Sequence, residues 1–233
     1  MHCHQARAMT SENTFFLNLE VPLAGFYHDM ISDDSDSETA NYFSGGIGGG
    51  RPFFTGGELF SIMPRIELGL GRVMSRHIIV GVRLQFTFVS GTYPYDVPGI
   101  ASSKMKLKSA YLGFLPFFEL TRSRNKRFVP FLLMSCGVRG EFARMESKNG
   151  PDFKLDQQVS RGVAALGGGT HIFPGDHFSI DLTLSFTMEM GRFSFETNTR
   201  DPYSYPPRYS PDVSKGFVVR VAGSLALGLS AWF

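Results

Sequence analysis

The last ten residues of the chain, "SLALGLSAWF" (residues 224–233), alternate apolar side chains with small or polar ones and end on an aromatic residue. Successive side chains of a β-strand point to opposite faces, so this alternation predicts a strand with one apolar face. That face carries Leu225, Leu227, Leu229 and Phe233. The fold depends on which solvent the apolar face meets.

The same two-residue period recurs along the whole chain. It is clearest in "FSIDLTLSFTMEM" (residues 178–190), where large apolar residues alternate with Ser, Asp, Thr and Glu. A glycine-rich run, "RGVAALGGGTHI" (residues 161–172), also suits a strand, but its pattern does not assign its two faces. Together the runs predict eight strands, at residues 14–23, 61–71, 78–88, 111–120, 128–141, 161–172, 178–190 and 217–233.

The connections between these strands alternate in length. Three are short, at 74–77, 122–126 and 174–176, and four are long, at roughly 25–58, 92–104, 144–158 and 195–213. Strict alternation puts every short turn at one end of the sheet, which predicts an all-β, closed, eight-stranded antiparallel up-and-down barrel. We expect residues 13–233 to form this single domain, and residues 1–12 to be a disordered N-terminus or a processing remnant.

The two faces of the strands differ in a way that predicts their environments. The polar face is rich in Gly, Ser and Thr and carries charges of both signs in similar number, which predicts ion pairs across a narrow interior. The apolar face is too large to hide inside a barrel of this size, so we expect it to face lipid. The predicted interior charges are Arg65, Glu67, Arg83, Glu119, Arg139, Glu141, Asp181, Glu189 and Arg220. Aromatic residues near the strand ends suit interfacial girdles: Phe15, Phe88, Phe128, Phe142, Phe173, Phe178, Phe193 and Phe217.

The final strand resembles the C-terminal assembly signal of bacterial outer-membrane barrels, a terminal aromatic preceded by apolar residues at alternate positions. Leu225, Leu227, Leu229 and Phe233 match that pattern. In architecture the chain is similar to the broad class of small eight-stranded outer-membrane proteins. This resemblance implies a location in the bacterial outer membrane, recognition by the barrel-assembly machinery, and closure of the last strand against the first. It also leads us to expect a monomer in contact with outer-membrane lipid and lipopolysaccharide. The alternative is a soluble lipocalin-like barrel, whose N-terminal Gly-x-Trp motif is absent here.

The bulk composition narrows the remaining classes. A formal net charge of +2 provides no strong basic field for nucleic acid. No apolar run reaches the roughly 20 residues of a membrane helix, and the first nine residues lack the apolar segment of a signal peptide. We expect Cys3 and Cys136 to be free thiols. No cofactor and no metal is expected: the acidic run Asp33, Asp34, Asp36 and Glu38 lacks the spacing of a calcium loop and suits a solvated surface loop.

These features predict a non-enzymatic barrel with no catalytic residues. Side chains can fill the interior of an eight-stranded barrel, so structural or surface-interaction roles would belong to the long loops. Passive transport of small or apolar molecules is one alternative. A lipid-modifying enzyme is another, because "HFSID" places His177, Ser179 and Asp181 on one face, and His171 is nearby; that face, however, should point inward. The tyrosines of the long loops suit either partner contact or filler over the barrel mouth: Tyr93, Tyr95, Tyr203, Tyr205 and Tyr209.

Overall fold

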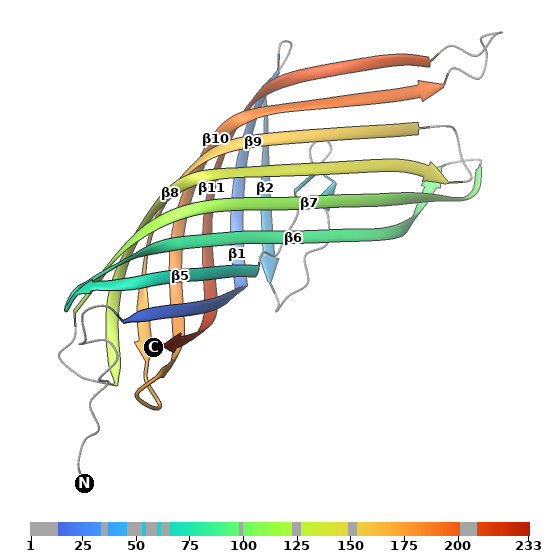
Figure 1. Cartoon of the computed structure of the whole chain (residues 1–233). Coiled ribbons are helices and arrows are strands. Elements are labelled where there is room, and N and C mark those ends of the chain that lie inside the picture. Colours follow the sequence, from blue (N-terminus) through green and yellow to red (C-terminus); the bar gives the residue numbers. More distant parts are fainter. Residues whose placement is uncertain are drawn as a thin grey trace.

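The strands of the chain wrap into a tall barrel (Figure 1). The computed structural model describes residues 14–33, 37–45, 53–54, 60–61, 66–97, 100–122, 127–148, 153–200 and 209–233. Its strands are β1 (Phe15–Asp33), β2 (Ser37–Gly45), β3 (Phe53–Phe54), β4 (Phe60–Ser61), β5 (Ile66–Ser75), β6 (Ile78–Val97), β7 (Ile100–Thr121), β8 (Phe128–Lys148), β9 (Phe153–Ile172), β10 (Phe178–Arg200) and β11 (Tyr209–Trp232). No helix among these residues is long and apolar enough to cross a membrane.

Eight of the described strands form a closed antiparallel ring. Neighbours in sequence pair from β5 through to β11, and β1 pairs with both β11 and β5. The closing contact includes hydrogen bonds from the Phe15 amide to the Phe233 carbonyl (3.1 Å) and from the Phe233 amide to the Phe15 carbonyl (2.9 Å). Beyond its short contact with β5, β1 pairs with the ninth strand, β2. The predicted eight-stranded up-and-down barrel, closed by the last strand against the first, is therefore confirmed.

The predicted long connections are wrong, because most of their residues belong to strands. β6 continues to Val97 and β7 begins at Ile100, while β8 ends at Lys148 and β9 begins at Phe153. Residues 209–213 likewise belong to β11, residues 195–200 to β10, and most of residues 25–45 to β1 and β2. The acidic run falls partly in these strands, and Asp34 and Asp36 lie outside the described residues.

The strands continue because the apolar and polar faces exchange sides along the barrel. Near the short turns and in the middle of the wall, the apolar residues point outward. Toward the other end, Lys108 and Arg144 are exposed, whereas their neighbours Leu107 and Met145 are buried inside. An exterior that passes from lipid into water requires this reversal. The outward apolar face ends at that boundary, although each strand continues beyond it.

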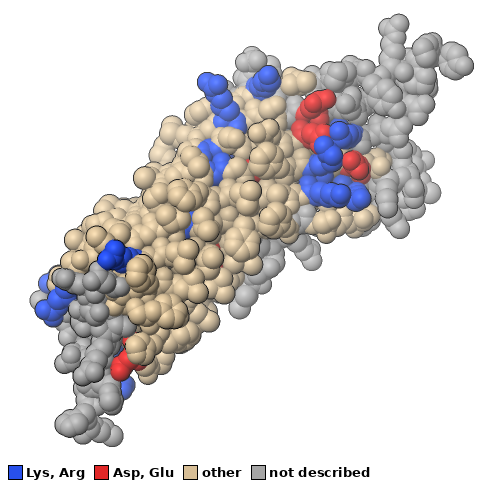
Figure 2. All heavy atoms as spheres, in the orientation of Figure 1, with Lys and Arg blue, Asp and Glu red and all other residues tan. Residues whose placement is uncertain are grey.

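The outward face of the wall carries exposed large apolar side chains on all eight strands of the ring. Figure 2 shows a broad band of uncharged residues, with most charged side chains gathered to either side of it. Aromatic residues border this band: Phe15, Phe128 and Phe178 at the short-turn end and Phe88, Phe142 and Phe217 at the other end are exposed. Phe173 and Phe193, predicted to belong to the girdles, are instead buried inside the barrel: Phe193 occupies an inward position of β10, and Phe173 directly follows the end of β9.

The height of the apolar band fits a bilayer. Phe128 and Phe142 lie 14 residues apart on the outward face of β8. At a rise of about 3.3 Å per residue and a tilt of about 45°, they are about 33 Å apart along the barrel axis. A bilayer hydrocarbon core is about 30 Å thick. The two aromatic borders therefore lie close to the expected membrane interfaces.

Candidate functional site

The interior of the barrel contains most of its buried charge. Of the nine predicted interior charges, eight have side chains that point inward, and Arg65 lies outside the described residues. Two further inward charges, Glu20 and Arg161, and the inward His171 join them. These groups form three layers that follow one another along the barrel.

The layer nearest the long hairpins consists of three arginines and two glutamates. Arg139 and Arg161 are direct cross-strand neighbours, an arrangement that is unfavourable for like charges. Glu189 bridges them: it forms an ion pair with Arg139 and lies 3.4 Å from the Arg161 guanidinium. Glu141 accepts from Arg161 at 2.6 Å and lies 3.6 Å from Arg220. The layer is thus held together by carboxylates placed between cations.

The middle layer has the opposite arrangement. Glu20 and Glu67 are direct cross-strand neighbours on β1 and β5. The Arg83 guanidinium lies between them, 3.3 Å from Glu20 and 3.5 Å from Glu67. Gln85 links this layer to the first, because its amide donates to Glu67 while its oxygen accepts from Arg139 Nε at 2.6 Å. The two charged layers therefore form one hydrogen-bonded column.

The third layer, toward the short turns, is built around His171. The imidazole contacts Asp181 through Nδ1 at 2.7 Å and Glu119 through Nε2 at 2.9 Å. Asp181 also accepts from Asn18 at 2.8 Å and from Ser179 at 2.7 Å. Every one of these side chains is buried. The geometry holds the histidine between two carboxylates, with both ring nitrogens occupied.

The serine–histidine cluster considered for the enzyme alternative is not assembled into a nucleophile and base. Ser179 donates to Asp181 rather than to a histidine, and the Trp232 indole donates to the Ser179 hydroxyl at 3.0 Å. His177 is exposed, and its Nδ1 lies 3.2 Å from the Trp232 carbonyl oxygen. Predicting that His177 shares the inward face of Ser179 and Asp181 was wrong, because His177 precedes the first residue of β10.

Apolar layers cover the polar column at both ends. At the short turns, Phe16 stacks on Trp232 at 4.9 Å, and these rings belong to a larger cluster with Val73, Ile79, Phe117, Val129, Phe131, Leu133 and Phe173. At the other end, two smaller clusters fill the inner face: Val159, Phe193 and Val218, and Leu107, Ala143, Met145 and Leu155. Between them, a cavity of about 40 Å³ touches Arg83, Gln85 and Arg139 among other residues, which is room for a few water molecules.

Sequence reasoning did not assign Arg161 and His171 to the interior, because it left the faces of residues 161–172 open; His171 was named only as a neighbour of the enzyme candidate. The structure places Arg161, Val163 and His171 inside and Leu166 and Ile172 outside. The parity of the strand contained the missing signal: Arg161 and His171 are ten residues apart, so they share a face, and the large apolar Leu166 and Ile172 share the opposite one.

The tyrosines predicted for the loops lie differently. The backbones of Tyr93 and Tyr95 belong to β6, and that of Tyr209 begins β11. The loop prediction is wrong for these three, because the strands extend beyond the apolar band. Tyr203 and Tyr205 lie outside the described residues. Cys136 is a free, exposed cysteine on the outward face, and Cys3 also lies outside the described residues.

Comparisons with known proteins match the chain in fold only. No protein-family model and no curated protein sequence matches it. Among solved structures, the chain is similar to Neisserial surface protein A at 11% identity, with 95% of this chain and 100% of that chain covered and a TM-score of 0.41. It is also similar to the outer-membrane protein OprG of Pseudomonas aeruginosa at 12% identity, with 95% and 97% covered and a TM-score of 0.43. A third, the attachment invasion locus protein of Yersinia pestis, is 14% identical, with 92% and 99% covered and a TM-score of 0.33.

The class of protein follows from the barrel's own geometry rather than from these likenesses. The ring closes because β1 pairs with both β11 and β5, the outward face is apolar between two aromatic borders, and the inward face is polar and charge-paired. These are the properties of a transmembrane β-barrel. The chain is a small eight-stranded barrel of the bacterial outer-membrane type.

Proposed function

We propose that the protein is a non-enzymatic, non-conducting barrel of the outer membrane that serves structural or surface-interaction roles through its long-hairpin end. The observation that supports this most directly is the filling of the interior. The aromatic cluster around Trp232, the charged column and the apolar clusters around Leu107 and Val159 follow one another along the axis. The cavity of about 40 Å³ inside the column is too small for a solute path.

Single-channel recording in planar bilayers tests the proposal. The refolded full-length chain is expected to add no conductance steps, while an open porin in the same bilayer gives steps of constant size. Heat-modifiability of the same preparation shows that folded barrel was added. Regular steps that scale with salt concentration would contradict the proposal, because they require a water-filled path through the interior.

Transfer of small or apolar molecules is the second candidate. Its support is the apolar inner surface at the long-hairpin end, where Leu107, Met145 and Leu155 face inward. The aromatic cluster at the other end opposes a path along the axis. Uptake of a small, membrane-impermeant polar dye into proteoliposomes, compared with protein-free vesicles, distinguishes the candidates for small molecules: enhanced uptake favours transfer.

A lipid-modifying enzyme is supported least. Ser179, Asp181 and His171 are all buried in the interior, away from lipid and from the long-hairpin end. Incubation of the folded barrel with lipid A and phospholipids is expected to release no fatty acid, and time-dependent release that is lost on boiling would favour the enzyme.

A further inference from the structure

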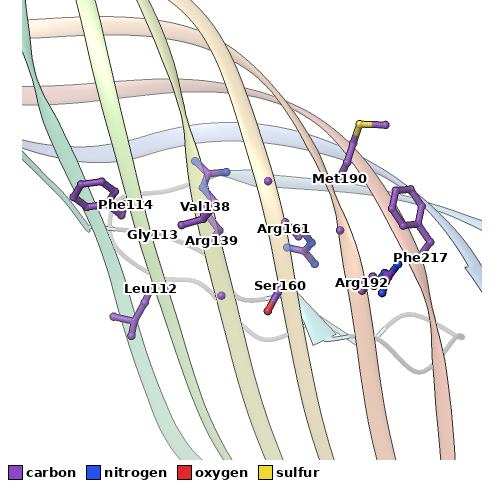
Figure 3. Close-up of a pocket in the computed structure, with 13 residues that line it drawn as sticks. Leu112, Gly113, Phe114, Val138, Arg139, Ser160, Arg161, Met190, Arg192 and Phe217 are labelled. Atoms are coloured by element: carbon purple, nitrogen blue, oxygen red, sulfur yellow. The ribbon is translucent and has the colours of Figure 1, made fainter.

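The outer wall of the barrel is hollowed on its lipid side. A groove of about 720 Å³ extends across the wall from β7 to β11 (Figure 3). Its floor consists of three small outward residues, Gly140 on β8 and Ser160 and Gly162 on β9. Gly140 and Ser160 are direct cross-strand partners, so the floor is continuous.

Large apolar side chains border this floor on both sides. Leu112 and Phe114 lie along one side and Met190 and Phe217 along the other, as Figure 3 shows. All four are between 43% and 50% exposed, so neither side is covered by another part of the described chain. The floor of the groove is thus two strands wide, about 10 Å, and its edges are apolar, which suits extended hydrocarbon chains.

The packing of the strands does not require glycine at the floor. A Cβ added at Gly140 would come no closer than 3.6 Å to another atom, and one added at Gly162 would lie 3.8 Å from the Met190 carbonyl oxygen. Both are ordinary contacts. Inward glycines differ: a Cβ at Gly191 would lie 1.9 Å from the Ser160 carbonyl oxygen, and the two backbones would have to move apart. The depth of the groove is therefore a property of the sequence that strand pairing does not explain.

A cation lies at the long-hairpin rim of the groove. Arg192 is exposed on the outward face, next to Ser160 in the strand register. Within the part of the chain that the structure describes, Arg192 forms no ion pair. The exposed Lys215 on β11 lies two residues farther along the register, opposite Ser194, and forms none there either. Four residues farther along, the outward carboxylates Asp156 on β9 and Glu196 on β10 are cross-strand partners. Asp156 is already bound by Arg144 at 2.6 Å and by a lysine at 2.7 Å.

Arg144 and Lys154 also set the protonation state of Asp156, which lies outside the apolar band. Partial burial raises its pKa, but the hydrogen bonds from Arg144 and Lys154 outweigh burial and hold the pKa below its ordinary value. Asp156 is therefore ionised at neutral pH and engaged with its own cations. Because no carboxylate of the described residues pairs with Arg192 or Lys215, their positive charge can meet an external anion.

We propose that this groove binds the lipid A part of lipopolysaccharide, with one acyl chain over Gly140 and Gly162 and a phosphate on Arg192. This rests on the proposed membrane location, in which the long-hairpin end faces the outer leaflet. An acyl chain gains no hydrophobic free energy by exchanging lipid neighbours for the groove. Selectivity must then come from shape and from the phosphate, which an arginine can bind through two parallel hydrogen bonds.

Native mass spectrometry of the refolded full-length chain in detergent, titrated with bisphosphorylated lipid A, tests the site. Arg192→Gln removes the cation, and Gly140→Leu combined with Gly162→Leu fills the floor without a backbone clash. Matched controls are Arg122→Gln and Thr170→Leu, exposed or outward positions near the short turns. We expect Arg192→Gln to weaken binding about tenfold, as for loss of one charge-assisted hydrogen-bond pair, the filled groove to weaken it comparably, and each control to change it less than about twofold.

The experiment distinguishes failure of this site from failure of the proposed function. A wild-type chain that shows no heat-modifiability fails as a membrane barrel, whatever it binds. Folded Arg192→Gln and filled-groove variants that bind lipid A as the wild type does would overturn the site alone. Phosphatidylethanolamine that binds as tightly as lipid A would also overturn the site. So would a filled groove that changes only the ratio of monomer to dimer, because a second copy of the chain would then be the occupant.

Discussion

Replacing Leu184 with arginine tests whether the outward face meets lipid. Leu184 lies at the centre of the outward run of β10 that extends from Phe178 to Met190, and 52% of its side chain is exposed. In a water-soluble barrel, an arginine at such an exposed position would change the free energy of unfolding by about 0.5 kcal/mol or less. In a bilayer, the same change puts a charge near the midplane.

The expected cost in lipid is about 2–4 kcal/mol, a change of roughly 30- to 900-fold in the folding equilibrium. The matched control is Ser194→Arg, on the same face of β10 but ten residues farther along. At about 3.3 Å per residue and a 45° tilt, it lies about 23 Å farther along the barrel axis. There the predicted cost is about 0–1 kcal/mol.

Guanidinium unfolding in lipid vesicles, followed by tryptophan fluorescence, measures both costs. The chain has one tryptophan, Trp232, which is 1% exposed at the short-turn end and reports directly on the folded interior. Equal, small costs for Leu184→Arg and Ser194→Arg would refute the inference that residues 178–190 face lipid. A cost at position 184 that exceeds that at 194 by at least 1 kcal/mol is the predicted result.

Three further predictions concern the interior, the wall and the closing strand. Glu189→Leu leaves Arg139 and its arginine neighbour without their shared carboxylate and should cost about 3–5 kcal/mol in the same unfolding experiment; a cost under 1 kcal/mol would mean that the layer is not charge-paired. Gly191→Ala should destabilise the barrel by about 1–3 kcal/mol, because its Cβ would meet backbone 1.9 Å away, whereas Gly162→Ala should be neutral, and equal effects would contradict the packing. Deletion of Phe233 removes the two hydrogen bonds between Phe15 and Phe233 at the end of the β1–β11 pairing. It should lower the amount of assembled barrel severalfold at unchanged synthesis, measured by membrane fractionation and immunoblotting; normal assembly would remove its role as a signal.

The regular part of the fold could be predicted from sequence because there the two-residue period of each strand coincides with a single outward face that is apolar throughout. Along residues 178–190, each outward position is apolar and each inward one is polar or small, so one rule describes the whole run. Beyond the apolar band the rule reverses: Lys108 points outward to water and Leu107 inward. In the sequence, this reversal is visible only as the end of the outward apolar face. That ending led to a prediction of loops where the strands in fact continue.

The composition of the charged interior could be predicted, but its pairing could not. Alternation alone puts Arg139 and Glu189 inside. Which charges meet depends on how far each strand is shifted against the next around the ring, and no local pattern encodes that shift. Arg161 stayed unassigned for a different reason: the glycines around it weaken the contrast between the two faces of β9.

The outward face of the barrel can be tested most directly by cell fractionation combined with gel migration of boiled and unboiled protein. A closed barrel embedded in the outer membrane predicts recovery in the outer-membrane fraction and a change in migration on boiling, because a closed hydrogen-bonded ring resists detergent until it is heated. Recovery as a soluble protein without such a change would contradict the account, and the apolar faces of β6 and β10 would then have to be buried.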